Sequence, residues 1–342
     1  MTAGPESVGA GRVAWAAAFS HRDFRRFQGA RILSVLGMQM QSVAIGWQIY
    51  SITGRALDLA WVGLAQFFPA AGLSLVTGHV ADRFDRRAIL AVCHAAMAGL
   101  SIALMLVARD GGTHVAPVYA VLVGIGVARA FLGPANQALL PTLVSPEHFG
   151  NAVAWGSSLW QAATVLGPML GGVAYAAFAG PARVYGMAAG CALGALVLVS
   201  TMRARPIASR GPATRASVLA GVRYVWTNQI VLGAISLDLF AVLLGGATAL
   251  LPIYARDILH LGPWALGALR AAPAAGAAVT GVLLAFRPIE RRAGRKMFLG
   301  VAVFGAATIV FGLSTSFAPA LLALVLIGAA DMVSVFVRSA LV

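Results

Sequence analysis

Ionisable side chains stand inside long apolar segments of this sequence, among them Arg129, Asp238 and Asp331. A charge at the centre of a lipid bilayer costs about 2.5–3.5 kcal/mol on insertion scales, so it usually faces water or a partner. A carboxylic acid in such surroundings holds its proton more tightly than it does in water, and it can then exchange protons near neutral pH. The sequence therefore predicts proton exchange at Asp238 or Asp331.

Polar and aromatic side chains recur within these segments. Gly133, Asn136 and Gln137 share one helical face with Arg129, because they follow it at helical spacing. The candidates for a substrate cavity are Gln41, Gln48, Asn136, Gln137, Trp160 and Gln161. Such side chains contact an apolar or aromatic compound when they line a cavity, and otherwise they stabilise helix–helix contacts or an interfacial belt. Both interpretations are open at this point.

The elements that position these side chains are apolar segments. Hydrophobic residues make up 60% of the 342 positions and charged residues only 11%, against about 25% charged residues in soluble domains. Ten segments of roughly 20 residues are long enough to cross a ~30 Å hydrocarbon core. They span residues 27–50, 57–79, 88–108, 115–139, 151–176, 183–202, 229–254, 264–286, 297–315 and 319–340. We expect an all-α polytopic membrane protein rather than a barrel, because alternating ten-residue strands are not found.

The basic residues are unevenly distributed. Of the 25 Lys and Arg residues, 17 lie in the arm at 1–26 and in the loops at 80–87, 203–228 and 287–296, and only four lie in the opposite loops. This bias predicts a multi-pass protein of the cell (plasma or inner) membrane with a cytoplasmic N-terminus. It also argues against nucleic acid as the reason for the net charge of +14. The remaining four basic residues lie inside the predicted apolar segments; they are Arg31, Arg129, Arg270 and Arg338.

The chain contains an internal repeat. Residues 49–78 align with residues 253–282 without a gap, and residues 69–72 are identical to residues 273–276. The same order and an even number of helices between copies indicate a parallel repeat about an axis along the membrane normal. Further along the chain, Asp331 is the counterpart of Arg129.

The repeat predicts the organisation of the chain. We expect a cytoplasmic arm (1–26), a six-helix bundle (27–202), a cytoplasmic linker (203–228) and a second bundle of four helices (229–342). Residue 342 corresponds to residue 140, so the counterparts of 141–202 are expected to be missing. The layout is then six plus four helices, where six plus six would complete the repeat.

The segment from Gly78 to Arg87 resembles the signature of the major facilitator superfamily, a glycine followed by an Asp-Arg pair and then a basic pair. Asp85, in place of the usual glycine, is similar to the enterobactin-exporter-like branch of transmembrane secretion effectors. So are the stretches 24–27, 250–257 and 269–273. The resemblance implies a secondary transporter that exports a small amphiphilic compound (a siderophore, drug or macrolide) by proton-coupled alternating access. The alternative is a truncated, transport-inactive membrane protein.

The signature segment has a physical interpretation of its own. Gly78 is expected where two helices close in a tight turn. Asp82 stands among Arg83, Arg86 and Arg87, where a carboxylate pairs with an arginine or with a helix N-terminus. The resemblance implies a conformational latch, in which Asp82 contacts an eleventh helix that this chain is expected to lack. The alternative is a basic cytoplasmic loop in which Asp82 is simply paired.

The run Gly167-Pro168-Met169-Leu170-Gly171-Gly172 resembles the Gly-Pro-x-x-Gly-Gly core of a motif associated with exporters. Proline bends a helix and glycine lets a neighbour approach closely. Ala154 and Ala163 stand where the longer motif has further glycines. The alternative is a packing kink with no link to the direction of transport.

The resemblance also assigns a role to Arg129, which occupies the place of the family's helix 4 arginine, a residue linked to proton coupling. Helices 1, 4, 7 and 10 line the cavity in this family, which implies a pair of Arg129 with Asp331. In the alternative, Asp331 pairs locally and Arg338 reaches toward the cytoplasmic side. The proton-coupling candidates are therefore Arg129, Asp238 and Asp331.

The residue patterns typical of an enzyme's active site are not found in the sequence. It offers no Ser/His/Asp set, no paired carboxylates and no phosphate-binding glycine loop after a strand. Cys93 and Cys191 fall within predicted helices and imply neither a disulfide nor a metal site. His79 and His94 are expected to pack or to face the interface. We expect no cofactor; the expected partners are a small-molecule substrate, protons and the lipid bilayer, and the oligomeric state is left open.

Overall fold

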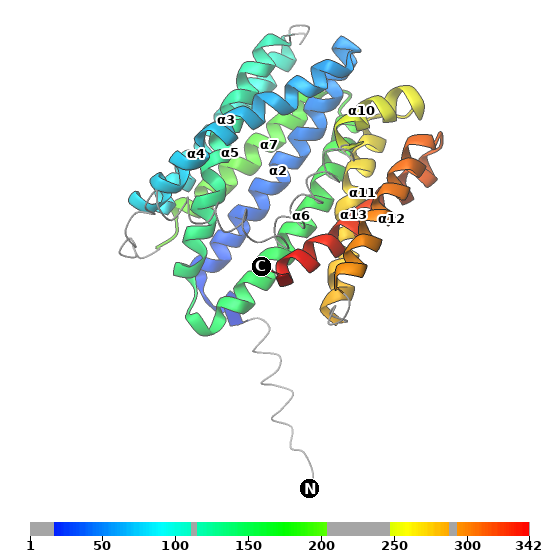
Figure 1. Cartoon of the computed structure of the whole chain (residues 1–342). Coiled ribbons are helices and arrows are strands. Elements are labelled where there is room, and N and C mark those ends of the chain that lie inside the picture. Colours follow the sequence, from blue (N-terminus) through cyan, green and yellow to red (C-terminus); the bar gives the residue numbers. More distant parts are fainter. Residues whose placement is uncertain (1–16, 111–114, 204–246, 287–292, 342) are drawn as a thin grey trace. The chain divides into compact units, whose positions relative to one another are not determined.

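A computed structural model describes residues 17–110, 115–203, 247–286 and 293–341, and every regular element within them is helical (Figure 1). The long helices are α2 (Arg22–Thr53), α3 (Ala56–Arg83), α4 (Arg86–Arg109), α5 (Ala116–Leu143), α6 (Phe149–Ala177), α7 (Pro181–Ser200), α11 (Pro263–Phe286), α12 (Ala293–Leu313) and α13 (Phe317–Leu341). The short elements are η1 (Ala17–Ser20), η2 (Pro146–His148), η3 (Ala247–Leu250), α10 (Leu251–Ile253) and the π-helical turn η4 (Tyr254–Ile258).

The prediction of an all-α membrane protein is confirmed, and each long helix lies over one of the predicted segments. The seventh predicted segment, 229–254, lies outside the described residues except for its last part, where η3 and α10 lead into η4. Most of the predicted linker, 203–228, also lies outside them. The division into arm, two bundles and linker stays a prediction.

Helix α2 begins five residues before the predicted start at residue 27. Asp23 lies in its first turn, where a carboxylate is favoured by the positive end of the helix dipole. The apolar pattern marks where a helix enters lipid. It cannot mark the polar turn by which the helix extends beyond the lipid.

Short turns connect the first helices. Gly54 follows α2 with φ of 61°, and its N–H donates to the Tyr50 carbonyl at 2.9 Å; glycine adopts this conformation without steric cost. Asp85 precedes α4, and its carboxylate accepts from the Arg87 N–H at 3.0 Å as an N-cap. Gly78 lies inside α3. The expectation that Gly78 forms the turn is wrong, because the helix continues past it to Arg83.

Seven of the described helices are long and apolar enough to cross a membrane, namely α3, α4, α5, α7, α11, α12 and α13. Helices α2 and α6 are not among these seven, although their 32 and 29 residues are ample length for a ~30 Å core; α2 is the more polar of the two. Gln28, Gln41 and Gln48 are all buried on α2. A helix packed among others tolerates such side chains, which a lipid-facing helix does not.

Large apolar side chains remain exposed along the helices. Phe67 is 63% exposed, Phe68 62% and Leu313 78%. In water such a surface would be an aggregation hazard, whereas in lipid it is the surface expected of a membrane protein.

The helices form two compact units. Among the described residues, the first unit comprises those up to Met38, Val62–Ala163 and those from Tyr185 to Arg203. The second comprises Gln39–Trp61, Thr164–Val184 and the residues from Ala247 onward. The boundaries fall inside α2, α3, α6 and α7.

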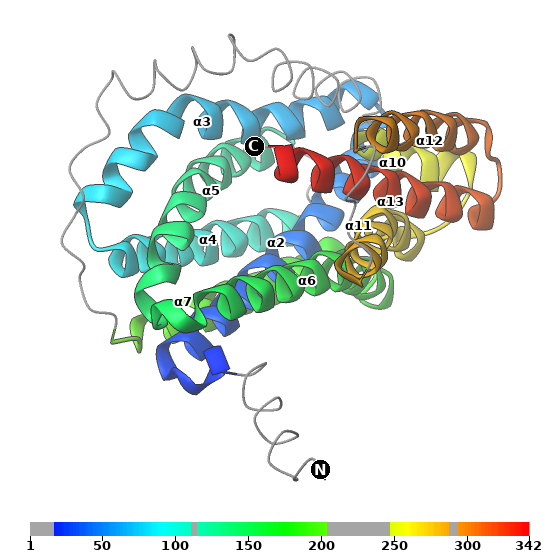
Figure 2. The ribbon, with the colours of Figure 1, turned by 60° about the horizontal axis from the view of Figure 1, so that its bottom comes forward.

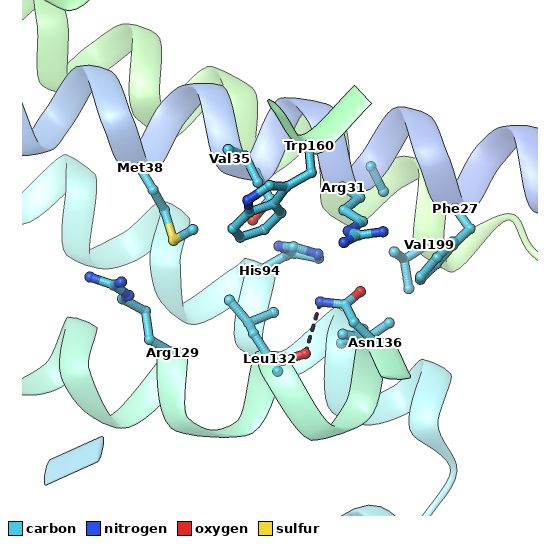
Figure 3. Close-up of a pocket in the computed structure, with 14 residues that line it drawn as sticks. Phe27, Arg31, Val35, Met38, His94, Arg129, Leu132, Asn136, Trp160 and Val199 are labelled. Carbon is cyan, nitrogen blue, oxygen red and sulfur yellow. Dashed lines mark hydrogen bonds between the residues drawn. The ribbon is translucent and has the colours of Figure 1, made fainter. Parts of the chain in front are cut away.

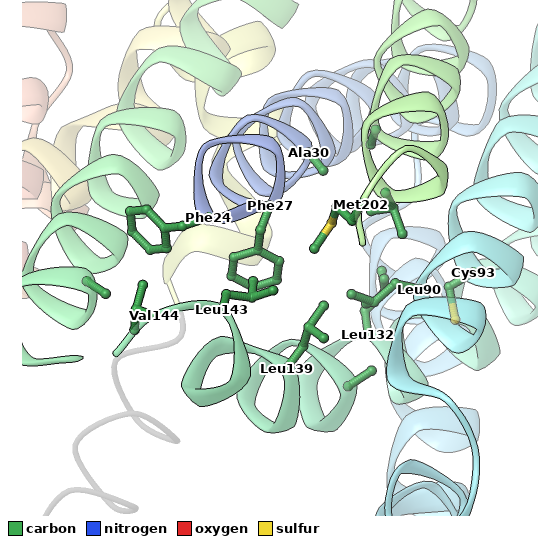
Figure 4. Packing of buried hydrophobic residues seen from close by; sticks show 14 of the residues in the cluster. Phe24, Phe27, Ala30, Leu90, Cys93, Leu132, Leu139, Leu143, Val144 and Met202 are labelled. Atoms are coloured by element: carbon green, nitrogen blue, oxygen red, sulfur yellow. The ribbon is translucent and has the colours of Figure 1, made fainter. Parts of the chain in front are cut away.

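The first unit is built on a cluster of buried apolar residues from α2, α4, α5, α6 and α7. Figure 4 shows side chains of this cluster, among them Phe27 of α2, Leu90 of α4 and Leu139 of α5. In the second unit, α13 packs between α11 and α12 (Figure 2). There the Tyr254 ring stacks on Phe311 with centroids 4.3 Å apart, and its hydroxyl donates to the carbonyl of Phe311.

Equivalent glycines of the repeat lie at close helix crossings. A Cβ on Gly126 of α5 would lie 2.6 Å from the carbonyl oxygen of Gln66 in α3. A Cβ on Gly328 of α13 would lie 1.8 Å from the carbonyl oxygen of Pro273 in α11. Position 328 is the counterpart of 126, and α11 is the counterpart of α3. Both copies of the repeat therefore place a glycine against the backbone of the equivalent helix. The contacted residue in the second copy, Pro273, lies about one turn beyond the counterpart of Gln66.

Candidate functional site

A cavity of about 170 Å³ lies within the first unit, between α2, α4, α5, α6 and α7 (Figure 3). Its lining combines arginine, histidine and amide groups with aromatic and aliphatic walls. The lining residues are Phe27, Ala30, Arg31, Ser34, Val35, Met38, Leu90, His94, Arg129, Leu132, Gly133, Asn136, Trp160 and Val199.

The charged lining of the cavity is entirely cationic. Arg31 contributes from α2 and Arg129 from α5, and no Asp or Glu belongs to the lining. The Arg31 guanidinium lies 5.3 Å from the centroid of the Trp160 ring. Arg129 donates from Nη1 to Oε1 of Gln66 at 3.0 Å. Within the described ranges, neither arginine forms an ion pair with a carboxylate.

Two further polar side chains reach the cavity. His94 of α4 is only 3% exposed, and its Nδ1 has no hydrogen-bond partner among the described residues. Asn136 of α5 donates from Nδ2 to the Leu132 carbonyl at 2.8 Å. Figure 3 shows the polar ends of Arg31, His94 and Asn136 turned toward the same part of the cavity, with Arg129 at its other end.

The local packing explains how these groups are held. The cavity wall shares three residues with the buried cluster of the first unit, namely Phe27, Leu90 and Leu132. The polar cavity therefore borders directly on the hydrophobic core. Gly156 of α6 leaves space for the arginine: a Cβ there would lie 2.9 Å from Nη1 of Arg31. A larger residue at position 156 would displace the guanidinium.

The structure brings only some of the predicted cavity residues together. Arg129, Asn136 and Trp160 line the cavity. Gln137 and Gln161, each the direct neighbour of a lining residue, do not belong to the lining. Gln41 and Gln48 are buried on the part of α2 that belongs to the second unit. The substrate role of these four residues stays a prediction.

The sequence reasoning missed Arg31 and His94. Arg31 lies inside an apolar segment as Arg129 does, so the cost of an intramembrane charge points to both residues equally. His94 was expected to pack or to face the interface. It does pack, but it also lines the cavity, and its Nδ1 has no hydrogen-bond partner in the part of the chain that the structure describes.

The basic residues of the signature segment contact backbone carbonyls. Arg86 donates from Nε to the carbonyl of Ala81 at 3.1 Å. Arg87 donates from Nε to the carbonyl of Val199 at 3.1 Å and from Nη2 to that of Ser200. A cation is favoured there, because the last carbonyls of a helix are unpaired and carry partial negative charge. The basic pair thus ties α4 to the ends of α3 and α7.

The latch prediction for this segment is untested. Asp82 lies in α3, but its side chain is outside the described part of the structure. Arg83 is the last residue of α3 and is exposed. A latch that involves Gly78, Asp82, Arg83, Arg86 and Arg87 stays a prediction.

The exporter-like motif lies at a helix contact of the second unit. Gly167, Pro168, Gly171 and Gly172 are all buried on α6. A Cβ on Gly171 would lie 2.7 Å from Cα of Met40 in α2.

A Cβ on Gly172 would lie 2.5 Å from the carbonyl oxygen of Pro263 and 2.9 Å from Cα of Gly267, both in α11. The glycines therefore permit α6 to contact two helices at backbone distance. This observation supports the packing interpretation of the motif, and it does not bear on the direction of transport.

A polar cluster joins the end of α2 to η4 in the second unit. The Tyr50 hydroxyl donates to Oδ2 of Asp257. Arg256 donates from Nη1 to the Tyr50 carbonyl at 3.1 Å, and its guanidinium lies 5.7 Å from the centroid of the Tyr50 ring. Beside it, Trp47 and Tyr175 meet edge-to-face with centroids 6.5 Å apart. We call Tyr50, Arg256 and Asp257 the Tyr50 cluster.

The proton-coupling candidates are only partly described. Asp331 is half-buried on α13, and Asp238 lies outside the described residues. Arg129 and Asp331 belong to different units, so their pairing stays a prediction. Within the described ranges, no group of three or more His, Cys, Asp or Glu side chains is placed to hold a metal ion.

Comparison with known proteins identifies the family. The sequence profile described as "Transmembrane secretion effector" matches residues 13–338. The chain is 27% identical to the enterobactin exporter EntS of Citrobacter koseri over 301 residues, which cover 84% of this chain and 70% of that protein. It is 25% identical to the MFS-type transporter YkuC of Bacillus subtilis over 160 residues, which cover 46% of this chain and 36% of that protein.

Solved structures show the same fold. A bacterial homologue of the human lysosomal transporter Spinster, in an inward-facing and unoccupied conformation, matches with a TM-score of 0.68 and 17% identity, over 94% of this chain and 74% of that one. The human organic anion transporter MFSD10 matches with a TM-score of 0.61 and 17% identity, over 94% and 85%. At this identity the likeness concerns the fold alone. The profile match establishes that the chain belongs to the transmembrane secretion effector family of major facilitator superfamily transporters and is a transporter rather than an enzyme.

Proposed function

We propose that this transporter exports a small amphiphilic compound from the cytoplasm by proton-coupled alternating access. The observation that carries the proposal is the cavity of the first unit, in which arginine, histidine and amide groups stand beside the aromatic rings of Phe27 and Trp160. Such a lining suits a molecule with one polar and one apolar end. The matches to transporters do not favour the alternative of a transport-inactive product.

The proposed orientation has the N-terminus in the cytoplasm and the chain in the cell (inner) membrane, on the basis of the 17-to-4 distribution of basic residues. In this orientation the start of α2, the α3–α4 turn and the end of α7 face the cytoplasm. Phe27, Leu90 and Val199 of the cavity lining lie close to those helix ends. The cavity is then nearer to the cytoplasm, from which an exporter collects its substrate.

Cysteines at the two ends of α4 test this orientation. In a background with Cys93 and Cys191 replaced by serine, we expect Asp110→Cys to react with a membrane-impermeant maleimide in intact cells. We expect Asp85→Cys to react only after the cells are opened. The two positions mark the two ends of one helix, so the reversed labelling pattern would refute the orientation.

The alternating-access part of the proposal concerns contacts in the second unit. The Tyr50 cluster and the contact of Gly172 with α11 lie toward the helix ends that the proposed orientation places outside the cell. We infer that they hold the outer side closed, and that export requires them to open. The signature segment from Gly78 to Arg87 would act as the latch of the cytoplasmic side.

Proton coupling is assigned to Asp331 and Asp238, with Arg129 as a fixed positive charge, because arginine is not deprotonated in proteins. In everted vesicles with an acid interior, we expect the chain to drive accumulation of at least one compound from a panel of radiolabelled aromatic carboxylates, amines and neutral drugs. Asp331→Asn or Asp238→Asn should reduce this accumulation about tenfold, which corresponds to about 1.4 kcal/mol.

The matched control is Asp110→Asn, which changes a carboxylate at the end of α4 and should leave accumulation unchanged. An Asp331→Asn or Asp238→Asn variant that keeps its full dependence on the pH gradient would remove that residue from the scheme. Equal accumulation across the whole panel in vesicles with and without the chain would count against export itself.

A further inference from the structure

We propose that the cavity of the first unit binds the anionic group of its ligand, with Arg31 as the principal charge partner and Arg129 as the second. The inference rests on the proposed function and specifies its substrate class: an amphiphilic compound with an anionic end, such as a carboxylate, rather than a cationic or neutral one.

The positive charge of the cavity lining is uncompensated among the described residues. Arg31 and Arg129 line one cavity, no acidic residue lines it with them, and neither has an ion-pair partner in the part of the chain that the structure describes. An arginine inside a membrane-spanning segment that served only to stabilise the fold would be expected to have a carboxylate partner, because an unpaired charge there is costly. An anionic ligand supplies the missing charge.

The two arginines also retain unused hydrogen-bonding capacity within the described structure. Arg129 gives one of its five N–H donors to Gln66. Arg31 contacts only the face of the Trp160 ring, so its in-plane donors are free within the described structure. Arginine recognises planar carboxylates through two parallel hydrogen bonds, and these free donors are of the required type.

His94 offers a further donor for an anionic ligand. Its Nδ1 is buried without a hydrogen-bond partner among the described residues, which normally has a cost. A neutral imidazole carries its proton on one nitrogen or the other, so Nδ1 can donate to an anion that enters the cavity. Arg31 and His94 turn their polar ends toward the same part of the cavity (Figure 3).

The size and walls of the cavity specify the rest of the ligand. Its volume of about 170 Å³ is below the ~300–1,000 Å³ of sites that enclose drug-sized molecules. The cavity therefore holds the anionic end of a ligand and the ring beside it. Trp160, Phe27 and Met38 supply aromatic and aliphatic surface for that ring.

The experiment measures binding to the purified full chain in phosphatidylcholine nanodiscs by titration calorimetry. The probes share one aromatic ring system: 2-naphthoate, neutral 2-naphthamide and the cation 2-naphthylmethylammonium. We expect naphthoate to bind at least about tenfold more tightly than the amide, and the cation to bind most weakly. Tenfold corresponds to about 1.4 kcal/mol, close to the lower end for a hydrogen bond to a charged group.

The variants test which residues carry the preference. Arg31→Gln should lower naphthoate affinity to that of the amide, and Arg129→Gln should lower it less, because Arg129 is already engaged by Gln66. Arg31→Lys should retain part of the preference for the anion. Arg109→Gln is the matched control, because it removes an arginine at the end of α4, outside the cavity.

Three results would overturn the inference. The first is binding of the amide or the cation as tight as that of naphthoate. The second is retention of the preference by both Arg31→Gln and Arg129→Gln, and the third is an equal loss of the preference in Arg109→Gln. If Arg31→Gln does not fold, as judged by its thermal midpoint, Arg129→Gln and Arg31→Lys keep the test decisive.

A phospholipid headgroup offers the same anionic chemistry as a soluble carboxylate. Repeating the titration in nanodiscs with phosphatidylglycerol separates the two sources. Weaker naphthoate binding in the wild type but not in Arg31→Gln assigns the site to a lipid phosphate, and equal binding in both lipids assigns it to a soluble anion. The binding test needs no transport, so its failure would leave export standing, and a failure of export would leave the anion site standing.

Discussion

Replacing Gly328 by alanine is expected to lower the thermal midpoint of the purified protein by roughly 6–12 °C. The new Cβ would lie 1.8 Å from the carbonyl oxygen of Pro273, a distance that no Cβ adopts. The obstacle is backbone, which cannot turn away as a side chain can, so α13 and α11 must separate. Overpacking of this kind costs about 3 kcal/mol, and each kcal/mol lowers the midpoint by roughly 2–4 °C in proteins somewhat smaller than this.

Gly305→Ala is the matched control. Gly305 lies on α12 in the same unit, and a Cβ there would meet no described atom within 4 Å. Alanine favours a helix over glycine by about 1 kcal/mol, so we expect an unchanged or slightly raised midpoint. Equal midpoints for Gly328→Ala and Gly305→Ala, measured in one detergent by differential scanning fluorimetry, would show that α11 and α13 are not in backbone contact.

The sequence predicts the helices well because the bilayer sets their length. Each described long helix overlaps an apolar segment of about 20 residues, the length that a ~30 Å core requires. The helix ends are less predictable, because they depend on caps such as Asp85 and on turns such as that at Gly54. These polar residues lie outside the hydrophobic pattern.

The cavity was predictable only in part. Arg129 stands out as a charge in an apolar segment, and Asn136 follows on its helical face. Spacing alone cannot separate Asn136 from Gln137, however, because both lie close to that face and only the packing of α5 decides which one lines the cavity. The contribution of His94 depends on the approach of α4 to α2 and α5, which a single sequence does not encode locally.

The role of Arg87 illustrates the same limit. Its contacts with the carbonyls of Val199 and Ser200 join residues more than one hundred positions apart. The sequence shows a basic pair after a signature aspartate, and this pattern suits either a latch or contacts with the carbonyls at a helix end. In the folded chain Arg87 contacts the carbonyls at the end of α7. The latch would require a contact of the Asp82 side chain.

Replacing Gly172 or Gly267 by alanine is expected to destabilise the contact between α6 and α11. A Cβ on Gly172 would lie 2.5 Å from the Pro263 carbonyl oxygen, and a Cβ on Gly267 would lie 2.5 Å from the Pro168 carbonyl oxygen. Each single change should cost about 2 kcal/mol and lower the thermal midpoint by roughly 4–8 °C. The control on the same helix is Gly150→Ala, where a Cβ would meet no described atom within 4 Å.

The double variant tests whether the two glycines share one contact. A single separation of α6 from α11 relieves both clashes, so the second substitution should cost much less than the first, with a coupling energy of about 1 kcal/mol or more. Because this contact is proposed to close the outer side, both single variants should also reduce gradient-driven accumulation in vesicles. Additive losses of stability would show that the glycines act at separate contacts. Full transport by both variants would show that the contact has no part in alternating access.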